Sequence, residues 1–409
     1  MKKTLLRKYA KLIAVKGINV QKGQDVIVTA DLDQPEFVKM VVEECYRAGA
    51  GKVTVDWDYQ PLTKLHIRHR SVKTLSTVEK WEEEKFQYYV DKLPCRIYLI
   101  SEDPDGLNGI NQTKMAKGQQ ARYKVLKPYR DKIEGKYQWC IAAVPGKAWA
   151  KKVFPELKVS QAVEKLWQTI LYTSRVDEEK DAVENWISHN TDVHSKCDYL
   201  NSLDIEELEY SASNGTNLKV GLIPGSQFCG GSEKTLGGVE YNPNIPSEEC
   251  FISPMKGKAE GIVYSSKPLS YQGQLIENFN IRFEDGKAVE YHAEKNEELL
   301  GKLITMDENA AYLGECALVP YDSPISNSGI LFYNTLFDEN AACHLALGRG
   351  FIESIRNYPD YTLEQIQEMG VNDSMVHEDF MIGTPDLSII AHCRDGKSVQ
   401  IFKDGNWAI

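Results

Sequence analysis

The sequence lacks a long hydrophobic run. No apolar stretch approaches the roughly 20 residues that a membrane-spanning helix requires. The first residues carry a positive flank, but Arg7, Lys8 and Lys11 interrupt the apolar positions that a secretory leader would need. We therefore expect a cytoplasmic protein that has no membrane partner.

The cysteine patterns of a disulfide framework or a zinc ribbon are also missing. The chain has nine cysteines, an odd number, and they are scattered without a CxxC pair. A secreted disulfide scaffold would show an even, clustered set, and a structural zinc site would show paired cysteines. These cysteines are expected to be reduced thiols, which agrees with a cytoplasmic location.

Positive charge is in deficit. The chain has 48 Lys and Arg against 59 Asp and Glu, which gives a formal net charge of −11. Nucleic-acid binders normally present a basic face, so no nucleic-acid partner is expected. The phosphate-binding patterns GxGxxG and GxxxxGK[ST] are absent as well, which argues against a nucleotide-binding domain.

The length of 409 residues favours two domains, because single hydrophobic cores rarely grow that large. The first half alternates predicted helices with short apolar strands. Such alternation is typical of a mostly parallel sheet with covering helices, so residues 1–190 are predicted to form an α/β domain. The predicted helices span 5–15, 35–48, 72–92, 119–126 (ending before Pro128) and 158–173, and the predicted strands span 26–30, 53–57, 96–100 and 139–143.

The second half reads differently, with short strands and turn residues from 208 to 292. A hairpin is predicted over 281–289, where Asp285-Gly286 supplies a tight turn between alternating apolar positions. Helices are predicted at 294–304 and again from 339 onward. Residues 191–409 are therefore predicted to form an α+β domain with largely antiparallel strands, which we expect to bind metal and carry catalysis.

Acidic residues among apolar neighbours are the first chemical signal. Adjacent side chains of an extended segment point to opposite faces, so only one of Glu248 and Glu249 can face a given site. A solvated surface pair is the alternative for these two. Glu315 lies within the apolar run 313–320, and a buried carboxylate there requires a cation, a metal ion or a raised pKa. A buried salt bridge is the alternative for Glu315.

Histidines add the second signal. Residues 341–347 are predicted to form a helix with Asp338 as its N-cap, and Glu339 reaches the same cluster as His344 if it lies at or before the first turn. His377 and Asp379 are two apart, and in an extended segment both point to one face. A packed histidine is the alternative for His344, and the His-x-Asp pattern of His377 and Asp379 is a weak motif when taken alone. The other histidines are not predicted as ligands; His392, for example, has no carboxylate company comparable to that of His344 and His377.

Taken together, these stretches supply four carboxylates and two imidazoles, with a summed charge of −4. Two divalent cations would neutralise this set, whereas one would leave it at −2. The charge count therefore favours a two-metal site. Its predicted members are Glu249, Glu315, Glu339, His344, His377 and Asp379.

At these residues the sequence resembles the thermophilic-type metallo-aminopeptidases, the family of aminopeptidase T, aminopeptidase S and PepS. The resemblance spans nearly the whole chain. It is carried by residues 244–249, 314–315, 335–348 and 377–383 in the second half, and by 23–28 and 139–150 in the first.

The resemblance implies a metal-dependent aminopeptidase with two divalent ions held by those six residues, Glu315 bridging them. It also implies a homodimer with an enclosed cavity, acting on short peptides with a free N-terminus. Zinc or cobalt is favoured, and manganese or magnesium also suits an oxygen-rich donor set. For the proton transfer that hydrolysis needs, Glu249 is our first choice and Glu315 the second.

One position departs from the family pattern. The family commonly has a tyrosine near the metals, seven residues after the histidine that corresponds to His344, and this chain has Phe351 there. A hydroxyl that would stabilise the tetrahedral intermediate is then absent. Two alternatives remain open: a two-metal amidase acting on another aminoacyl conjugate, and a metal-stabilised binding protein without catalysis.

Overall fold

The chain folds as two units, and the computed structural model describes all 409 residues. One unit consists of Met1–His189 together with Ser232–Pro246. The other consists of Asn190–Gly231 together with Ser247–Ile409. The chain thus crosses between the units three times, and a short excursion from the second half belongs to the N-terminal unit.

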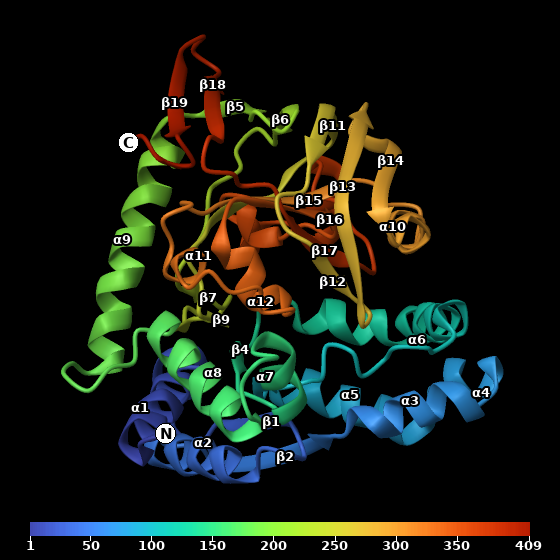
Figure 1. Ribbon diagram of the computed structural model, residues 1–409, viewed down its shortest axis with the longest axis vertical. Coiled ribbons are helices and arrows are strands. Elements are labelled where there is room, and N and C mark those ends of the chain that lie inside the picture. Colours follow the sequence, from blue (N-terminus) through green and yellow to red (C-terminus); the bar gives the residue numbers. More distant parts are fainter. The chain divides into compact units, whose positions relative to one another are not determined.

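Five parallel strands form the sheet of the N-terminal unit, in the order β2-β1-β3-β4-β9. Figure 1 labels β1, β2, β4 and β9 of this sheet. The first four strands are those predicted from the sequence, so the parallel α/β fold of this half is confirmed. The fifth comes from the excursion and pairs beside β4. The strands are β1 (Asp25–Asp31), β2 (Lys52–Asp58), β3 (Cys95–Ile100), β4 (Trp139–Ala143) and β9 (Asn244–Ile245), with the two-stranded β7 (Glu233–Lys234) and β8 (Glu240–Tyr241) apart from them.

Eight helices and a π-helical turn at Ile13–Gly17 accompany this sheet. Two predictions need correction. The single helix predicted over 72–92 is two helices, preceded by a helix that was not predicted. The helices are α1 (Lys3–Leu12), α2 (Pro35–Ala48), α3 (Gln60–His69), α4 (Val72–Ser76), α5 (Lys80–Lys92), α6 (Gln112–Ile133), α7 (Lys147–Val153) and α8 (Val159–Thr173).

The second correction concerns Pro128, where the predicted helix was expected to stop. Helix α6 instead continues through it to Ile133. A proline inside a helix costs about 3 kcal/mol, because it removes one hydrogen bond and crowds the preceding turn. Leu126 and Ile133 are both buried on either side of the proline, and α6 packs against α4 and α5. This packing offsets the local cost.

Two antiparallel sheets form most of the C-terminal unit, which confirms the predicted α+β class. The smaller sheet has the order β10-β15-β16-β17 and the larger runs β12-β13-β11-β6-β5-β18-β19-β20, with β14 beside β13. The smaller sheet comprises β10 (Cys250–Ile252), β15 (Leu313–Leu318), β16 (His344–Gly348) and β17 (His377–Met381). The larger comprises β5 (Ile205–Ser211), β6 (Asn217–Leu222), β11 (Pro254–Tyr264), β12 (Leu269–Tyr271), β13 (Gln274–Glu284), β14 (Lys287–Lys295), β18 (Ser388–Cys393), β19 (Ser398–Lys403) and β20 (Asn406–Trp407).

The predicted hairpin joins β13 to β14. Asp285 and Gly286 have φ of 48° and 74°, so both central residues of the turn are left-handed, as the two-residue hairpin turn requires. The helices of this unit are α9 (Ala182–Ser202, which begins in the N-terminal unit), α10 (Glu297–Ile304), α11 (Pro324–Asn327), α12 (Thr335–Asp338) and α13 (Leu363–Met369), with single 3-10 turns at Glu339–Ala341, Ile352–Ser354 and Tyr358–Asp360.

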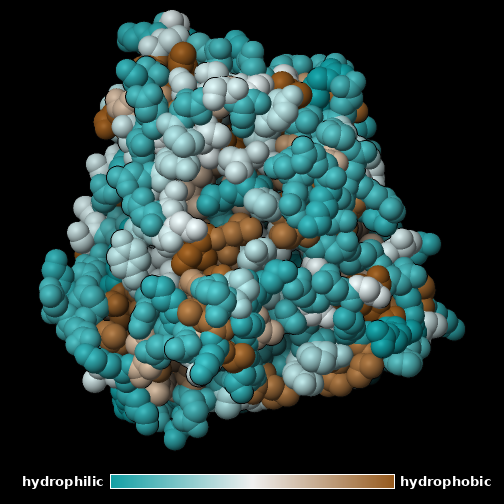
Figure 2. All heavy atoms as spheres, viewed as in Figure 1, coloured by the Kyte–Doolittle hydropathy of each residue, from teal (hydrophilic) through white to brown (hydrophobic).

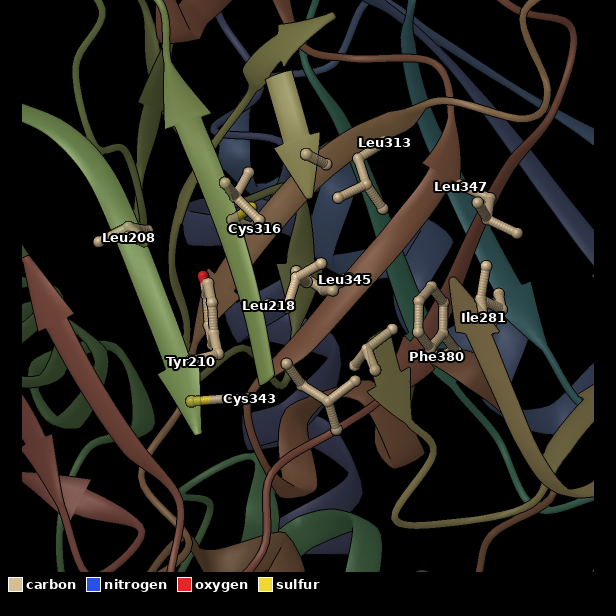
Figure 3. Packing of buried hydrophobic residues seen from close by; sticks show 14 of the residues in the cluster. Leu208, Tyr210, Leu218, Ile281, Leu313, Cys316, Cys343, Leu345, Leu347 and Phe380 are labelled. Carbon is tan, nitrogen blue, oxygen red and sulfur yellow. The ribbon is translucent and has the colours of Figure 1, made fainter. Parts of the chain in front are cut away.

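The hydrophobic core of this unit lies between the two sheets (Figure 3). Figure 3 shows side chains from the smaller sheet, such as Leu345 and Phe380, meeting side chains from the larger one, such as Leu218 and Ile281. One face of the smaller sheet therefore packs in the apolar core. The polar side chains on its strands lie on the other face.

The helix predicted over residues 341–347 is wrong. Glu339–Ala341 is a 3-10 turn and His344–Gly348 is strand β16, which lies between β15 and β17 with every residue buried. Alanine and leucine favour helices in isolation, but a short apolar run is equally compatible with a fully buried strand. Residues 344–348 form a strand here because they pair with β15 on one side and with β17 on the other.

Hydrophilic side chains dominate the face shown in Figure 2, and hydrophobic residues appear there in separate patches. None of the helices combines the length and apolar character that crossing a bilayer demands.

Candidate metal centre

The register of the smaller sheet brings carboxylates from separate strands together. Glu315 of β15 pairs with Ala346 of β16, and Ala346 pairs in turn with Asp379 of β17. Residues paired directly across strands point to the same face, so Glu315 and Asp379 lie on one face with only a methyl group between their positions.

The two histidines join that face because side chains alternate along a strand. His344 lies two residues before Ala346, and His377 lies two residues before Asp379. His377 and Asp379 therefore occupy the extended segment predicted for them. Glu249 directly precedes β10, whose Cys250 pairs with Leu318 at the edge of the same sheet.

The opposite face of the same strands is apolar. Cys316, Leu345 and Phe380 alternate with the polar residues and belong to the core between the sheets. Glu378 also points away from the cluster, since its partner across the strands is Leu347 of the core. Alternation along these strands therefore separates the polar cluster from the core.

Two overlapping groups of donor atoms result. The first is Glu249, Glu315 and His344, and the second is Glu315, His377 and Asp379; within each group the donor atoms lie within 4.8 Å of one another. Glu315 belongs to both groups. A single carboxylate shared by two groups is the arrangement that a bridging ligand requires.

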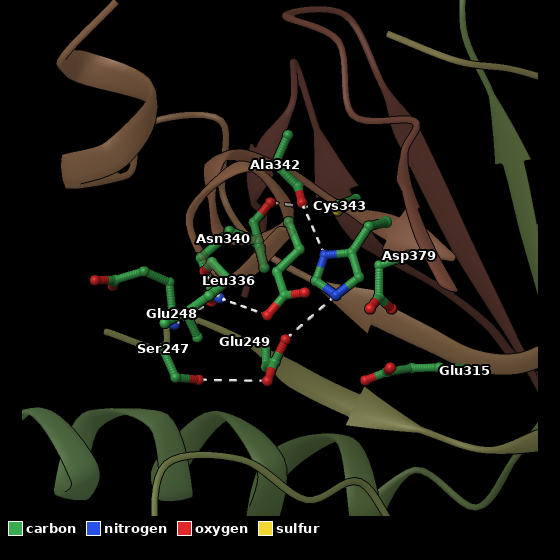
Figure 4. Close-up of polar contacts among 12 residues, drawn as sticks. Ser247, Glu248, Glu249, Glu315, Leu336, Asn340, Ala342, Cys343 and Asp379 are labelled. Carbon is green, nitrogen blue, oxygen red and sulfur yellow. Dashed lines mark hydrogen bonds and ion pairs between the residues drawn. The ribbon is translucent and has the colours of Figure 1, made fainter. Parts of the chain in front are cut away.

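Close contacts between imidazole and carboxylate define each group. His344 Nε2 lies 3.3 Å from Glu249 Oε2. His377 Nε2 lies 3.1 Å from Glu315 Oε2 and 3.3 Å from Asp379 Oδ1. Figure 4 shows Glu315 and Asp379 converging with Glu249, which comes from the segment just before β10.

Glu339 reaches the cluster from the 3-10 turn rather than from a helix. Its side chain is buried, and burial together with the carboxylates of Asp379 and Glu249 raises its pKa well above the usual range. The sixth predicted residue thus lies near the other five. The corrected secondary structure explains how: the turn ends before β16 begins, so Glu339 and His344 need not share a helical face.

The other pKa values show strong electrostatic coupling. Burial raises the pKa of Glu315 to about 7, and Asp379 and Glu249 add to this rise. Burial opposes the charged form of His344, but its hydrogen bond to Glu249 prevails and raises the imidazole pKa to about 9. Burial likewise opposes the charged form of Asp379, and the imidazolium of His377 nevertheless lowers the pKa of that carboxyl to about 2.

The histidines are oriented as metal ligands usually are. His344 Nδ1 lies 3.2 Å from the carbonyl oxygen of Ala342, and His377 Nδ1 lies 2.7 Å from that of Arg349. Donation of Nδ1–H to these carbonyls leaves the Nε2 lone pair directed at the cluster. Backbone carbonyls commonly hold ligating histidines in this way.

The donor set fits divalent metal ions. Asp379 Oδ1 is buried and accepts no hydrogen bond of regular geometry; its polar contact is His377 Nε2 at 3.3 Å. The four carboxylates and two neutral imidazoles carry a charge of −4, which divalent cations would offset.

Several neighbours of the cluster were not singled out from the sequence. Asn340 is fully buried beside Glu339, and Ala346 lies between the two facing carboxylates. The ring of Phe351, which the sequence did single out, lies 4.8 Å from that of His377. Adjacency to Glu339 was the only sequence signal for Asn340, and strand register was needed to find Ala346.

A third cluster corrects the expectation for His392. Strand pairing of β18 with β5 places its ring 2.8 Å from Glu209 Oε2, with Glu207 nearby. Lys219 Nζ lies 3.4 Å from Glu207 and 3.5 Å from Glu209, so a cation is already present. This partly exposed group is less suited to a metal ion than the buried one.

The chain is similar to known proteins over nearly its whole length. The chain matches the thermophilic metalloprotease family (M29) over residues 2–407. It is 40% identical to aminopeptidase AmpS of Bacillus subtilis (strain 168) over 404 residues, covering 98% of both chains. It is 37% identical to aminopeptidase T of Thermus thermophilus over 405 residues, covering 99% of this chain and 98% of that one.

The chain is also similar to solved structures over its whole length. The structure of wild-type AmpT from Thermus thermophilus matches with a TM-score of 0.88 at 36% identity, over 100% of both chains. A dioxygenase from Pseudomonas putida KT2440 matches with a TM-score of 0.54 at 11% identity, over 99% of this chain and 97% of that one, and shares the fold alone. The full-length match to the aminopeptidases establishes that this chain belongs to the M29 family of thermophilic metalloproteases.

Proposed function

We propose that this protein is a two-metal aminopeptidase that removes the N-terminal residue from short peptides. The observation that carries the proposal is the pair of donor groups that share Glu315. Membership in a family of metalloproteases with aminopeptidase relatives supports it.

In this proposal Glu249 and His344 would hold one ion and His377 and Asp379 the other, and Glu315, which belongs to both donor groups, would be shared between them. Glu339 adds the fourth carboxylate. When bound, such a pair of divalent ions lowers the pKa of a water molecule and polarises the scissile carbonyl. Zinc or cobalt is our first expectation, with manganese or magnesium as alternatives, because the donor set mixes oxygen and nitrogen.

Hydrolysis also needs a side chain of the cluster that transfers a proton. Glu249 is our choice for carrying the proton to the leaving amine, since it lies at the end of the cluster. Its Oε1 accepts a hydrogen bond from Ser247 Oγ at 3.4 Å, and its Oε2 faces His344. Glu315 is the second choice, because a bridging role commits both of its oxygens.

The test compares a leucyl or arginyl dipeptide with its N-acetylated form. Protein stripped with a chelator is reloaded with zinc, cobalt, manganese or magnesium, and bound metal is counted. Metal-dependent cleavage of the free-amine peptide alone, with two ions per chain, is the expected result. Cleavage of both peptides would favour an amidase on other aminoacyl conjugates.

Absence of cleavage with two ions bound would favour the binding-protein alternative, with Phe351 as the residue to examine. A homodimer and a cytoplasmic location remain parts of the proposal that rest on the resemblance. Light scattering of the purified protein tests the first, since it gives the mass in solution against the 46.3 kDa chain.

A further inference from the structure

Asn340 is the buried amide of the metal cluster. It lies in the 3-10 turn next to Glu339, and none of its surface is exposed. A buried amide destabilises the folded state unless its donors and acceptor are paired. The pairing of its side chain therefore shows what holds it in place.

Both polar atoms of this side chain have partners, in three hydrogen bonds (Figure 4). Oδ1 accepts a hydrogen bond of 2.6 Å from the backbone N–H of Glu248. Nδ2 donates to the carbonyl oxygen of Leu336 at 3.0 Å and to Glu339 Oε1 at 3.3 Å. One side chain thus contacts the Glu339 carboxylate and the segment that carries Glu249.

The backbone of this turn is fixed as well. Ser323, itself buried, donates its hydroxyl to the carbonyl oxygen of Asn340 at 3.1 Å, and the carbonyl oxygen of Ala341 lies 3.4 Å away. These contacts hold the amide against a second element, α11, which begins at the next residue. Asn340 is therefore held in place, and its side chain can orient both Glu339 and the backbone at Glu248.

Glu248 and Asn340 are 92 positions apart in the chain, yet each is adjacent to a proposed ligand. We propose that Asn340 is a positioning residue for the metal centre. Its amide fixes the Glu339 carboxylate relative to the segment of Glu249, so that both meet the ions in a single geometry. This inference rests on the proposed two-metal function and deepens it.

A positioning role differs from a purely structural one in what its loss changes. Outer-shell partners of metal ligands typically change metal affinity or activity by about 10–100-fold when removed. Loss of a structural amide lowers stability without a specific effect on the metal. A matched control is Asn372, a buried asparagine whose Nδ2 donates to two backbone carbonyl oxygens, of Asn309 at 2.9 Å and Gly348 at 2.6 Å.

The experiment titrates chelator-stripped full-length protein with Zn²⁺ in a calorimeter and records the visible spectrum after loading with Co²⁺. We compare wild type with Asn340→Ala and Asn372→Ala, and Asn340→Ser serves as a second variant if the alanine variant does not fold. For the Asn340 variants we expect metal affinity to fall about 10–100-fold, with an altered Co²⁺ spectrum. At saturating metal, kcat should fall while KM stays close to wild type, because Asn340 contacts the ligands rather than the peptide.

Asn372→Ala should lower the melting temperature as much as Asn340→Ala while leaving metal affinity and the Co²⁺ spectrum unchanged. Wild-type metal affinity in both Asn340 variants would overturn the positioning role, as would an equal loss of affinity in Asn372→Ala. Failure of the wild type to bind two ions would instead reject the proposed function itself. The two failures are distinguishable because metal binding is measured without peptide.

Discussion

Glu315 and Asp379 face each other across Ala346, which pairs with Glu315 on one side and with Asp379 on the other. Two strand spacings of about 4.8 Å separate their backbones. On the side of the sheet, the methyl group of Ala346 is therefore the only side-chain group between the positions of the two carboxylates. A larger side chain at this position would enter that space.

Replacement of Ala346 by valine tests this relationship. Valine suits a strand, so the fold should persist, but its added methyl groups would occupy the space between Glu315 and Asp379. We expect the affinity for Zn²⁺ to fall by at least about tenfold, with activity falling in parallel. Calorimetric titration of stripped protein measures the first, and dipeptide hydrolysis the second.

The control is Ala391→Val on β18, where the alanine is equally buried but lies in the apolar core. Overpacking a core typically costs about 1–3 kcal/mol. Both variants should therefore lose similar stability in urea unfolding, and only Ala346→Val should lose metal. An unchanged metal affinity in Ala346→Val would show that the ions do not lie over this alanine.

Local patterns predicted most of the N-terminal unit. The alternation of apolar strands and amphipathic helices identified four of its five parallel strands. Strand β9 was missed because it consists of two residues and comes from a distant part of the chain. Pairing between such distant segments leaves no periodic signal in the sequence.

The six residues predicted as metal ligands lie close together in the structure, although one element that carries them was misjudged. His344 was placed on a helix because Ala and Leu surround it, whereas the structure places it on a central strand. The carboxylates near His392 were missed for the same reason as Ala346. In both cases strand pairing, rather than sequence distance, creates the neighbourhood.

Asp379 and Glu378 are adjacent but face opposite sides of β17, which allows a paired test. Asp379→Asn removes a charged donor from the cluster, and we expect metal affinity and activity to fall by more than about 100-fold. Burial raises the pKa of Glu378 to about 8, so this carboxyl is mostly neutral at pH 7. Glu378→Gln should then leave both properties close to wild type.

Metal analysis and dipeptide hydrolysis at pH 7 measure both variants. Equal losses in the two would contradict the assignment of faces, since only Asp379 lies on the side of the cluster. Melting curves exclude a trivial explanation, because an unfolded variant would lose activity whatever its orientation.

The raised pKa values predict how the metal-free protein responds to pH. His344, at about 9 when folded against 6.5 when unfolded, favours folding below pH 6.5, and this contribution is lost as pH rises towards 9. Glu315, at about 7 when folded against 4.5 when unfolded, acts in the same direction between pH 4.5 and 7. These groups should therefore lower the melting temperature of stripped protein as pH rises from 6.5 to 9.

Metal ions should replace the protons of this cluster, because ligation needs neutral imidazoles and ionised carboxylates. We expect proton release on Zn²⁺ binding at pH 7, seen as a binding enthalpy that depends on the ionisation enthalpy of the buffer. The difference in melting temperature between metal-loaded and stripped protein should increase towards pH 9. A buffer-independent enthalpy would show that the ligands are already deprotonated without metal.

Phe351 provides the last test, because its ring lies 4.8 Å from that of His377 and 5.2 Å from that of Phe251. The ring is only partly buried, so Phe351→Tyr should fold and add a hydroxyl beside the cluster. One hydrogen-bond donor to a developing oxyanion is worth about 100-fold or more in kcat. We expect Phe351→Tyr to raise kcat by up to about 100-fold, with KM and metal affinity unchanged.

The control is Phe86→Tyr, which changes a partly buried ring that packs on Tyr89 in the N-terminal unit and should leave kcat unchanged. If kcat of Phe351→Tyr also stays at the wild-type value, the oxyanion is stabilised by another group, and the missing hydroxyl does not limit turnover in this chain.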